Sequence, residues 1–150
     1  IVKRVTIIFS AVLFTFMLCL TQTAMANDKC LDYATPLATS AKLLAKSIAA
    51  TTEALVAVNE RANANEITSF NDFVASAQER SEQMVRDLNE KQQRIMERAE
   101  SSKDYTLCKE DMQDELDELK ELSAQAKDLL VELKDSIKDM LSELKGAFFG

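Results

Sequence analysis

Apolar residues recur along this chain at alternating spacings of three and four residues, with polar and charged residues between them. Such spacing places the apolar side chains on one face of an α-helix. The pattern predicts three helices, over residues 36–62, 69–99 and about 107–145. The repeat has one stutter near residues 126–133. A break at residues 123–125, which would divide the third segment into two helices, is left open. We therefore expect an all-α fold, an elongated antiparallel bundle of three or four helices with coiled-coil-like packing.

The first helix is expected to begin at Thr35 and Pro36, because threonine can cap a helix and proline suits its first position. This segment is rich in alanine. Since small side chains allow close approach of neighbouring backbones, we expect it to be the most buried helix. Asn63 or Asn65 is expected to adopt the left-handed conformation that often ends a helix.

The second helix is expected to begin at residues 69–72, which resemble a capping box with aspartate in place of glutamate. Its predicted stripe on the buried face consists of Phe70, Val74, Ala77, Ser81, Met84, Leu88, Ile95 and Ala99. A second break is expected at residues 100–106. Gly146 is expected to cap the end of the third helix.

Residues 1–26 show the order of regions found in a secretory signal peptide. A basic start at residues 3–4 is followed by an almost continuously apolar stretch and by small residues at positions 24 and 26. We expect cleavage between Ala26 and Asn27, which leaves a helical domain of residues 27–150 in a bacterial periplasm or outside the cell. The alternative is an uncleaved membrane anchor, because the apolar stretch is just long enough to span a bilayer.

Cys30 and Cys108 are the two cysteines that follow the expected cleavage site. An even number of cysteines in an exported protein indicates a disulfide. In an up-down-up arrangement, the first and third helices begin at the same end of the bundle. The two cysteines are therefore expected to form a disulfide, and the alternative is a pair of unrelated buried thiols.

The composition argues against an enzyme and against a nucleic-acid-binding protein. The chain has no histidine, which removes the commonest general base and a usual ligand of zinc and haem. Two of the 18 basic residues and none of the 25 acidic residues precede residue 27, which leaves a net charge of −9. That charge opposes binding to nucleic acid or to anionic membranes, and it favours a basic partner. We expect no catalytic residue, no metal and no cofactor.

The densest charged run, residues 109–121, is a candidate partner-binding site with seven acidic residues and two lysines. The sharper interpretation is a docking surface for a basic partner, formed by Asp111, Asp114, Glu115 and Glu118. The simpler interpretation is a solvated face, since the dipole at a helix start favours carboxylates. A weak calcium site is a third interpretation, but the run lacks a loop of the EF-hand type.

Phe148 and Phe149 follow the expected end of the third helix and form a second candidate site. They either fold back onto the bundle or form an exposed hydrophobic handle for a partner or a membrane.

These observations favour an exported, non-enzymatic protein that acts by binding another protein. Small bundles of this kind serve as chaperones, as immunity or inhibitor proteins and as components of secretion machinery, which is an analogy from fold alone. The alternative is a structural envelope protein that self-associates through a long third helix. A less favoured alternative is membrane action through the alanine-rich first helix. Apart from that alternative, membrane contact is expected only through an uncleaved signal segment or the Phe148-Phe149 tail.

Overall fold

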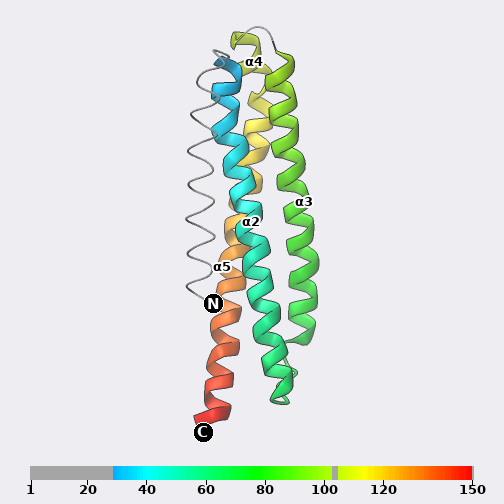
Figure 1. Ribbon diagram of the computed structural model, residues 1–150, viewed down its shortest axis with the longest axis vertical. Helices are drawn as coiled ribbons and strands as arrows, with labels where there is room; N and C mark the ends of the chain where they lie inside the picture. Colours follow the sequence, from blue (N-terminus) through cyan, green and yellow to red (C-terminus); the bar gives the residue numbers. More distant parts are fainter. Residues whose placement is uncertain (1–28, 103–104, 150) are drawn as a thin grey trace.

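The computed structural model describes residues 29–102 and 105–149, apart from the side chain of Phe149. These residues form helices and no strand, which confirms the all-α prediction. The helices are α2 (Lys29–Ala64), α3 (Asn71–Ser101), α4 (Tyr105–Asp111) and α5 (Gln113–Phe149) (Figure 1). The expected signal peptide and its cleavage site lie outside the described residues.

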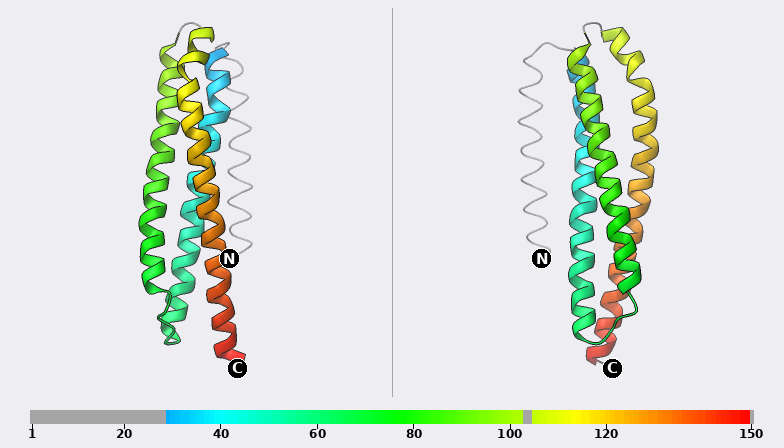
Figure 2. Two further views of the ribbon diagram at one scale, coloured as in Figure 1. Left: turned by 180° about the vertical axis from the view of Figure 1, so that it is seen from behind. Right: turned by 90° about the vertical axis from the view of Figure 1, so that its right-hand side faces the viewer.

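The three long helices lie side by side (Figures 1 and 2). α2 and α5 run in the same direction, and α3 runs in the opposite direction. The short helix α4 lies over the end at which α2 begins and α3 ends. α2 packs closely against both α3 and α5, whereas α3 and α5 contact each other less extensively. α2 is therefore the central packing partner of the other two long helices.

The alanine residues of α2 allow it to pack closely against both neighbouring helices. Ala34, Ala38, Ala41 and Ala45 are all buried at three- and four-residue spacing, so they form one narrow ridge. Because a methyl group is the largest side chain on that ridge, the neighbouring helices can approach closely. The ridge continues into larger buried side chains further along α2, at Ile48 and Leu55, and it ends at the small residue Ala62.

The start of α2 differs from the sequence prediction, because the helix begins at Lys29 and Pro36 lies inside it. Proline lacks the N–H that would bond to the carbonyl four residues earlier. The first turns are held by other contacts: Cys30 and Ala34 are buried, and the Thr35 hydroxyl donates to the Leu31 carbonyl at 2.7 Å. Thr35 therefore bonds backward within the helix instead of capping it.

The connection between α2 and α3 also differs from the prediction. Glu66, and neither Asn63 nor Asn65, takes the left-handed conformation, with φ of 64°. The N-cap of α3 is Phe70, and no side chain caps it. The backbone supplies the bonds instead, because the Ile67 N–H donates to the Ala62 carbonyl at 2.9 Å and the Val74 N–H donates to the Phe70 carbonyl. The capping box expected at residues 69–72 is therefore absent.

The third predicted segment is divided, but at Met112 and not at residues 123–125. The division is slight, because the Met112 N–H donates to the Cys108 carbonyl and the Leu116 N–H donates to the Met112 carbonyl. Gly146 is not a cap either, since α5 continues to Phe149 and no described glycine has a positive φ. α5 has 37 residues and α2 has 36, so the large difference in helix length expected from the sequence is also wrong.

Candidate functional site

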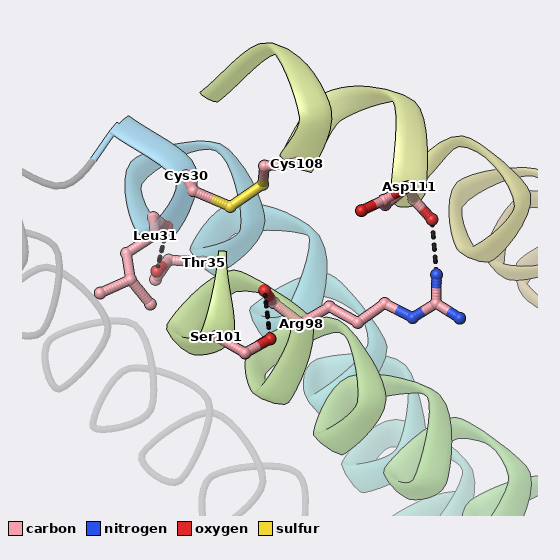
Figure 3. The surroundings of a disulfide bond; sticks show 7 residues. All are labelled: Cys30, Leu31, Thr35, Arg98, Ser101, Cys108 and Asp111. Carbon is pink, nitrogen blue, oxygen red and sulfur yellow. Dashed lines mark hydrogen bonds between the residues drawn. A yellow bond between two sulfur atoms is a disulfide. The ribbon is translucent and has the colours of Figure 1, made fainter. Parts of the chain in front are cut away.

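Cys30, in the first turn of α2, and Cys108, in α4, lie at disulfide distance, as the sequence predicts. Their Cα atoms are 6.2 Å apart, and both side chains are buried (Figure 3). A helix of seven residues is too short to be stable alone. The disulfide therefore holds α4 against the start of α2.

An aromatic cluster lies beside the disulfide. The rings of Tyr33 and Tyr105 meet edge to face, with their centroids 6.4 Å apart. The Lys109 Nζ lies 5.6 Å from the Tyr33 centroid and 5.8 Å from the Tyr105 centroid, within the range of a cation–π interaction. Lys109, the first of the two lysines of the acidic run, thus stabilises the contact between α2 and α4.

Arg98 holds the junction of α4 and α5 from the side of α3. Its Nη1 donates to the Asp111 carbonyl at 2.6 Å, as Figure 3 shows, and its Nη2 lies 3.4 Å from the Glu115 carboxylate. The Asp111 carbonyl is at the end of α4, where a helix leaves carbonyls without a partner. Arg98 therefore fixes the point at which the chain turns into α5.

Lys91 is the polar centre of the contact between α3 and α5. Its side chain is 8% exposed and donates to Glu115 at 2.5 Å and also to Glu118. Burial alone would lower the pKa of Lys91, but its hydrogen bonds to the two carboxylates raise that pKa above the usual range. The same contact lowers the pKa of Glu118. The ion pair between Lys91 and Glu118 therefore persists throughout the neutral pH range.

This arrangement engages part of the acidic run within the fold. Glu115 is 7% exposed and points to Lys91, so it is not available to a partner. Glu118 is more exposed but also bonds to Lys91. Asp111 and Asp114 are exposed, but they are separated by the division at Met112. The structure thus uses two of the four predicted residues to join α5 to α3.

A further contact extends the charged seam between α3 and α5. Arg80 donates two hydrogen bonds to Glu132, at 3.0 and 2.9 Å, and this lowers the pKa of Glu132. Within residues 29–102 and 105–149, every ion pair joins a cation of α3 to a carboxylate of α5. We call this contact the α3–α5 seam.

The opposite flank of α5 carries the lysines. Residues seven positions apart lie close to one line along a helix. Two such lines contain all five lysines of α5 and all three of its exposed large apolar residues. The lines are Lys120, Lys127, Lys134, Leu141 and Phe148, and Ala124, Val131, Lys138 and Lys145. Val131, Leu141 and Phe148 are 58%, 49% and 68% exposed, and we call the two lines together the lysine flank.

The part of the lysine flank nearest the start of α5 borders an open groove between α2 and α5, with a volume of about 620 Å³. Apolar and hydroxyl side chains of α2 form one wall, and Lys120 and Lys127 belong to the other. No acidic residue occurs in α2 between Asp32 and Glu53. Within the described part of the chain, the five lysines of this flank form no ion pair. The groove therefore combines apolar surface with unmatched positive charge.

Phe148 does not fold back onto the bundle. The residue is 68% exposed in the last turn of α5. This end of α5 extends beyond the connection between α2 and α3 (Figures 1 and 2). The side chain of Phe149 lies outside the described residues. Of the two interpretations of the tail, the structure thus contradicts folding back for Phe148.

Sequence reasoning missed both Lys91 and the lysine flank. Lys91 occupies a position of the buried stripe of α3, three residues after Leu88 and four before Ile95. The lysine flank is visible in the sequence when the lysines from Lys120 onward are counted in steps of seven. Both signals concern the position of a charge relative to the apolar repeat, and overall composition does not reveal them.

No group of residues suited to hold a metal occurs among the described residues. None of the described helices has a stretch long and apolar enough to span a bilayer. Comparison with protein-family models, with curated proteins and with solved structures finds no match for this chain.

Proposed function

We propose that this chain is an exported, non-enzymatic helical protein that acts by binding another protein in a bacterial periplasm or outside the cell. In this proposal residues 1–26 are removed as a signal peptide, and residues 27–150 form an elongated antiparallel bundle. Its role is that of a chaperone, an immunity or inhibitor protein, or a component of secretion machinery.

The lysine flank is the observation that supports this proposal. It places five unpaired lysines and three exposed large apolar side chains on one side of one helix. Exposed apolar side chains grouped on one surface are typical of a surface that binds another molecule. On the side of the same helix that faces α3, Glu115, Glu118 and Glu132 form ion pairs within the fold, whereas no lysine of the flank does so among the described residues.

The test is a native pull-down of the tagged protein from the envelope fraction, followed by measurement of the purified complex. We expect one near-stoichiometric protein that rebinds the purified chain at a defined ratio in isothermal titration calorimetry. Many substoichiometric proteins would favour the chaperone role among the three. Recovery of this chain alone would contradict binding to another protein and favour the alternative below.

The alternative is a structural protein that self-associates as a coiled coil. It is favoured by one observation, the separation of acidic and basic residues onto opposite flanks of α5, which is common in helices that pair with one another. A sedimentation coefficient that rises with protein concentration would support it, whereas a concentration-independent monomer would contradict it.

A further inference from the structure

We propose that the lysine flank, together with the groove between α2 and α5, binds an acidic amphipathic helix of the partner protein. This inference rests on the proposed function and adds the chemistry of the partner. The partner inferred here is acidic, whereas the net charge of the chain favours a basic partner. The difference arises because the inference uses the local charges of one surface and not the net charge.

The first argument is charge complementarity. The lysines at residues 120, 127, 134, 138 and 145 form no ion pair in the described part of the chain, although the mature chain is strongly acidic. Unpaired like charges along one flank repel each other, and a row of partner carboxylates would relieve that repulsion. In coiled coils, charges that border an apolar seam select the partner in this way.

The second argument is the shape and polarity of the groove. Its floor contains Leu116 and Leu119 of α5 and Leu37 and Leu44 of α2. Apolar side chains along a groove between parallel helices accept the apolar face of a third helix. The flank from Lys120 to Phe148 spans about 42 Å at the usual rise of 1.5 Å per residue, so it matches a partner helix of about 28 residues.

Two other occupants fit less well. A second copy that docks through the same surface around a two-fold axis would place lysines near lysines. An anionic membrane would be repelled by the net charge of −9 and by the exposed carboxylates on the neighbouring flank of α5. A flat membrane surface would also leave the concave groove unfilled.

The test uses the full mature chain and two synthetic helical peptides of about 28 residues. Both peptides have leucine at the seam positions, and the flanking positions carry glutamate in one and lysine in the other. The groove variant is Lys120→Glu with Lys127→Glu. The matched control is Lys42→Glu with Lys46→Glu, which makes the same change in charge at two exposed lysines of α2 that do not line the groove.

We expect the glutamate peptide to bind the wild-type chain in fluorescence anisotropy and the lysine peptide to bind at least about tenfold more weakly. The groove variant should weaken binding of the glutamate peptide by about tenfold, and the control variant by less than about twofold. Equal loss in both variants, no preference for glutamate, or no binding of the glutamate peptide would each overturn the inference.

Two further measurements separate the other occupants. Binding to vesicles of pure phosphatidylglycerol that the groove variant abolishes, without binding of the glutamate peptide, would assign the flank to membranes. Dimerisation of the wild-type chain that the groove variant abolishes would assign it to a second copy. If the groove variant retains the native partner of the pull-down as tightly as wild type, the proposed function stands and this inference fails. If the wild-type chain captures no partner, the proposed function itself fails.

Discussion

On the side of α5 that faces α3, carboxylates meet Arg80, Lys91 and Arg98. On the side that borders α2, Lys120 and Lys127 line a groove with apolar and hydroxyl side chains. The two sides belong to one helix, and one carries carboxylates where the other carries lysines. They differ in whether the neighbouring helix supplies the opposite charge. Charges that are matched within the fold contribute to its stability, and charges that remain unmatched are available for binding.

The largest expected effect on stability comes from the disulfide that joins the start of α2 to α4, just before α5 begins. Replacing Cys30 and Cys108 by serine removes a constraint on a sequence separation of 78 residues. The loop-entropy relation gives a loss of about 4–5 kcal/mol in the free energy of unfolding. Chemical denaturation of the double variant would measure it. A loss below about 1 kcal/mol would mean that packing alone holds α4 in place.

Removing the centre of the α3–α5 seam should have the next largest effect. Lys91→Ala leaves Glu115 buried without its main partner and should lower the free energy of unfolding by about 3 kcal/mol. Replacing Lys91 and Glu115 together by methionine should recover most of that loss, because no buried charge is then left alone.

The matched control is Lys127→Ala on the lysine flank, which should change stability by less than about 0.5 kcal/mol. Urea denaturation of these variants provides the comparison. Equal losses for Lys91→Ala and Lys127→Ala would break the distinction between the two sides of α5.

The pH dependence of stability should also come from the α3–α5 seam. The folded pKa values of Glu118 and Glu132 lie below the ordinary value of 4.5. Their contribution is therefore present above pH 4.5 and is lost as the pH falls through the lowered values. The folded pKa of Lys91 lies above its ordinary value of 10.5, so its contribution is lost as the pH rises through that higher value.

Denaturation midpoints measured from acidic to alkaline pH would test this expectation, which is a constant stability between the acidic and the alkaline losses. Arg80→Ala should flatten part of the decrease on the acidic side, because Glu132 then lacks the partner that lowers its pKa. An unchanged acidic slope in Arg80→Ala would place the titrating groups elsewhere.

The smallest effect on stability is expected on the lysine flank. Lys120→Glu with Lys127→Glu changes two exposed side chains that form no ion pair within the described residues, so the free energy of unfolding should change by less than about 0.5 kcal/mol. Thermal denaturation followed by circular dichroism would show this. A large loss would mean that these lysines support the fold, and it would contradict the view that the lysine flank is free for binding.

The repeat of apolar residues was sufficient to predict the all-α fold and most of the stripe of α3, and the alanine content of α2 indicated its central packing, but the ridge of Ala34, Ala38 and Ala45 was not predicted. Local signals at helix ends were less reliable, because tertiary contacts override them. Proline is tolerated inside α2 since buried side chains hold the turns before it, and the helix continues through Gly146 although glycine often ends a helix. Both residues have a local preference that is weaker than packing.

The site was harder to predict, because its character depends on which helix faces which charge. Glu115 and Glu118 are adjacent in sequence to exposed carboxylates, and only the position of Lys91 on α3 distinguishes them. Similarly, the five lysines of α5 are alternated with acids along the chain, and helix geometry separates them. For Lys120 and Lys127, which border α2, the lack of a partner reflects the absence of acidic residues in α2 between Asp32 and Glu53.

The position of the disulfide also determines how this protein would respond to mechanical force. A pull applied to Lys29 and to the end of α5 would pass directly from Cys30 to Cys108 and bypass the residues between them. α2 and α3 would carry little of the load, and only the chain after Cys108 could extend. The 37 residues of α5 could lengthen to about 130 Å when fully extended. The helix with the candidate binding surface is therefore the one that would detach first under tension, while the α2–α3 hairpin stays folded.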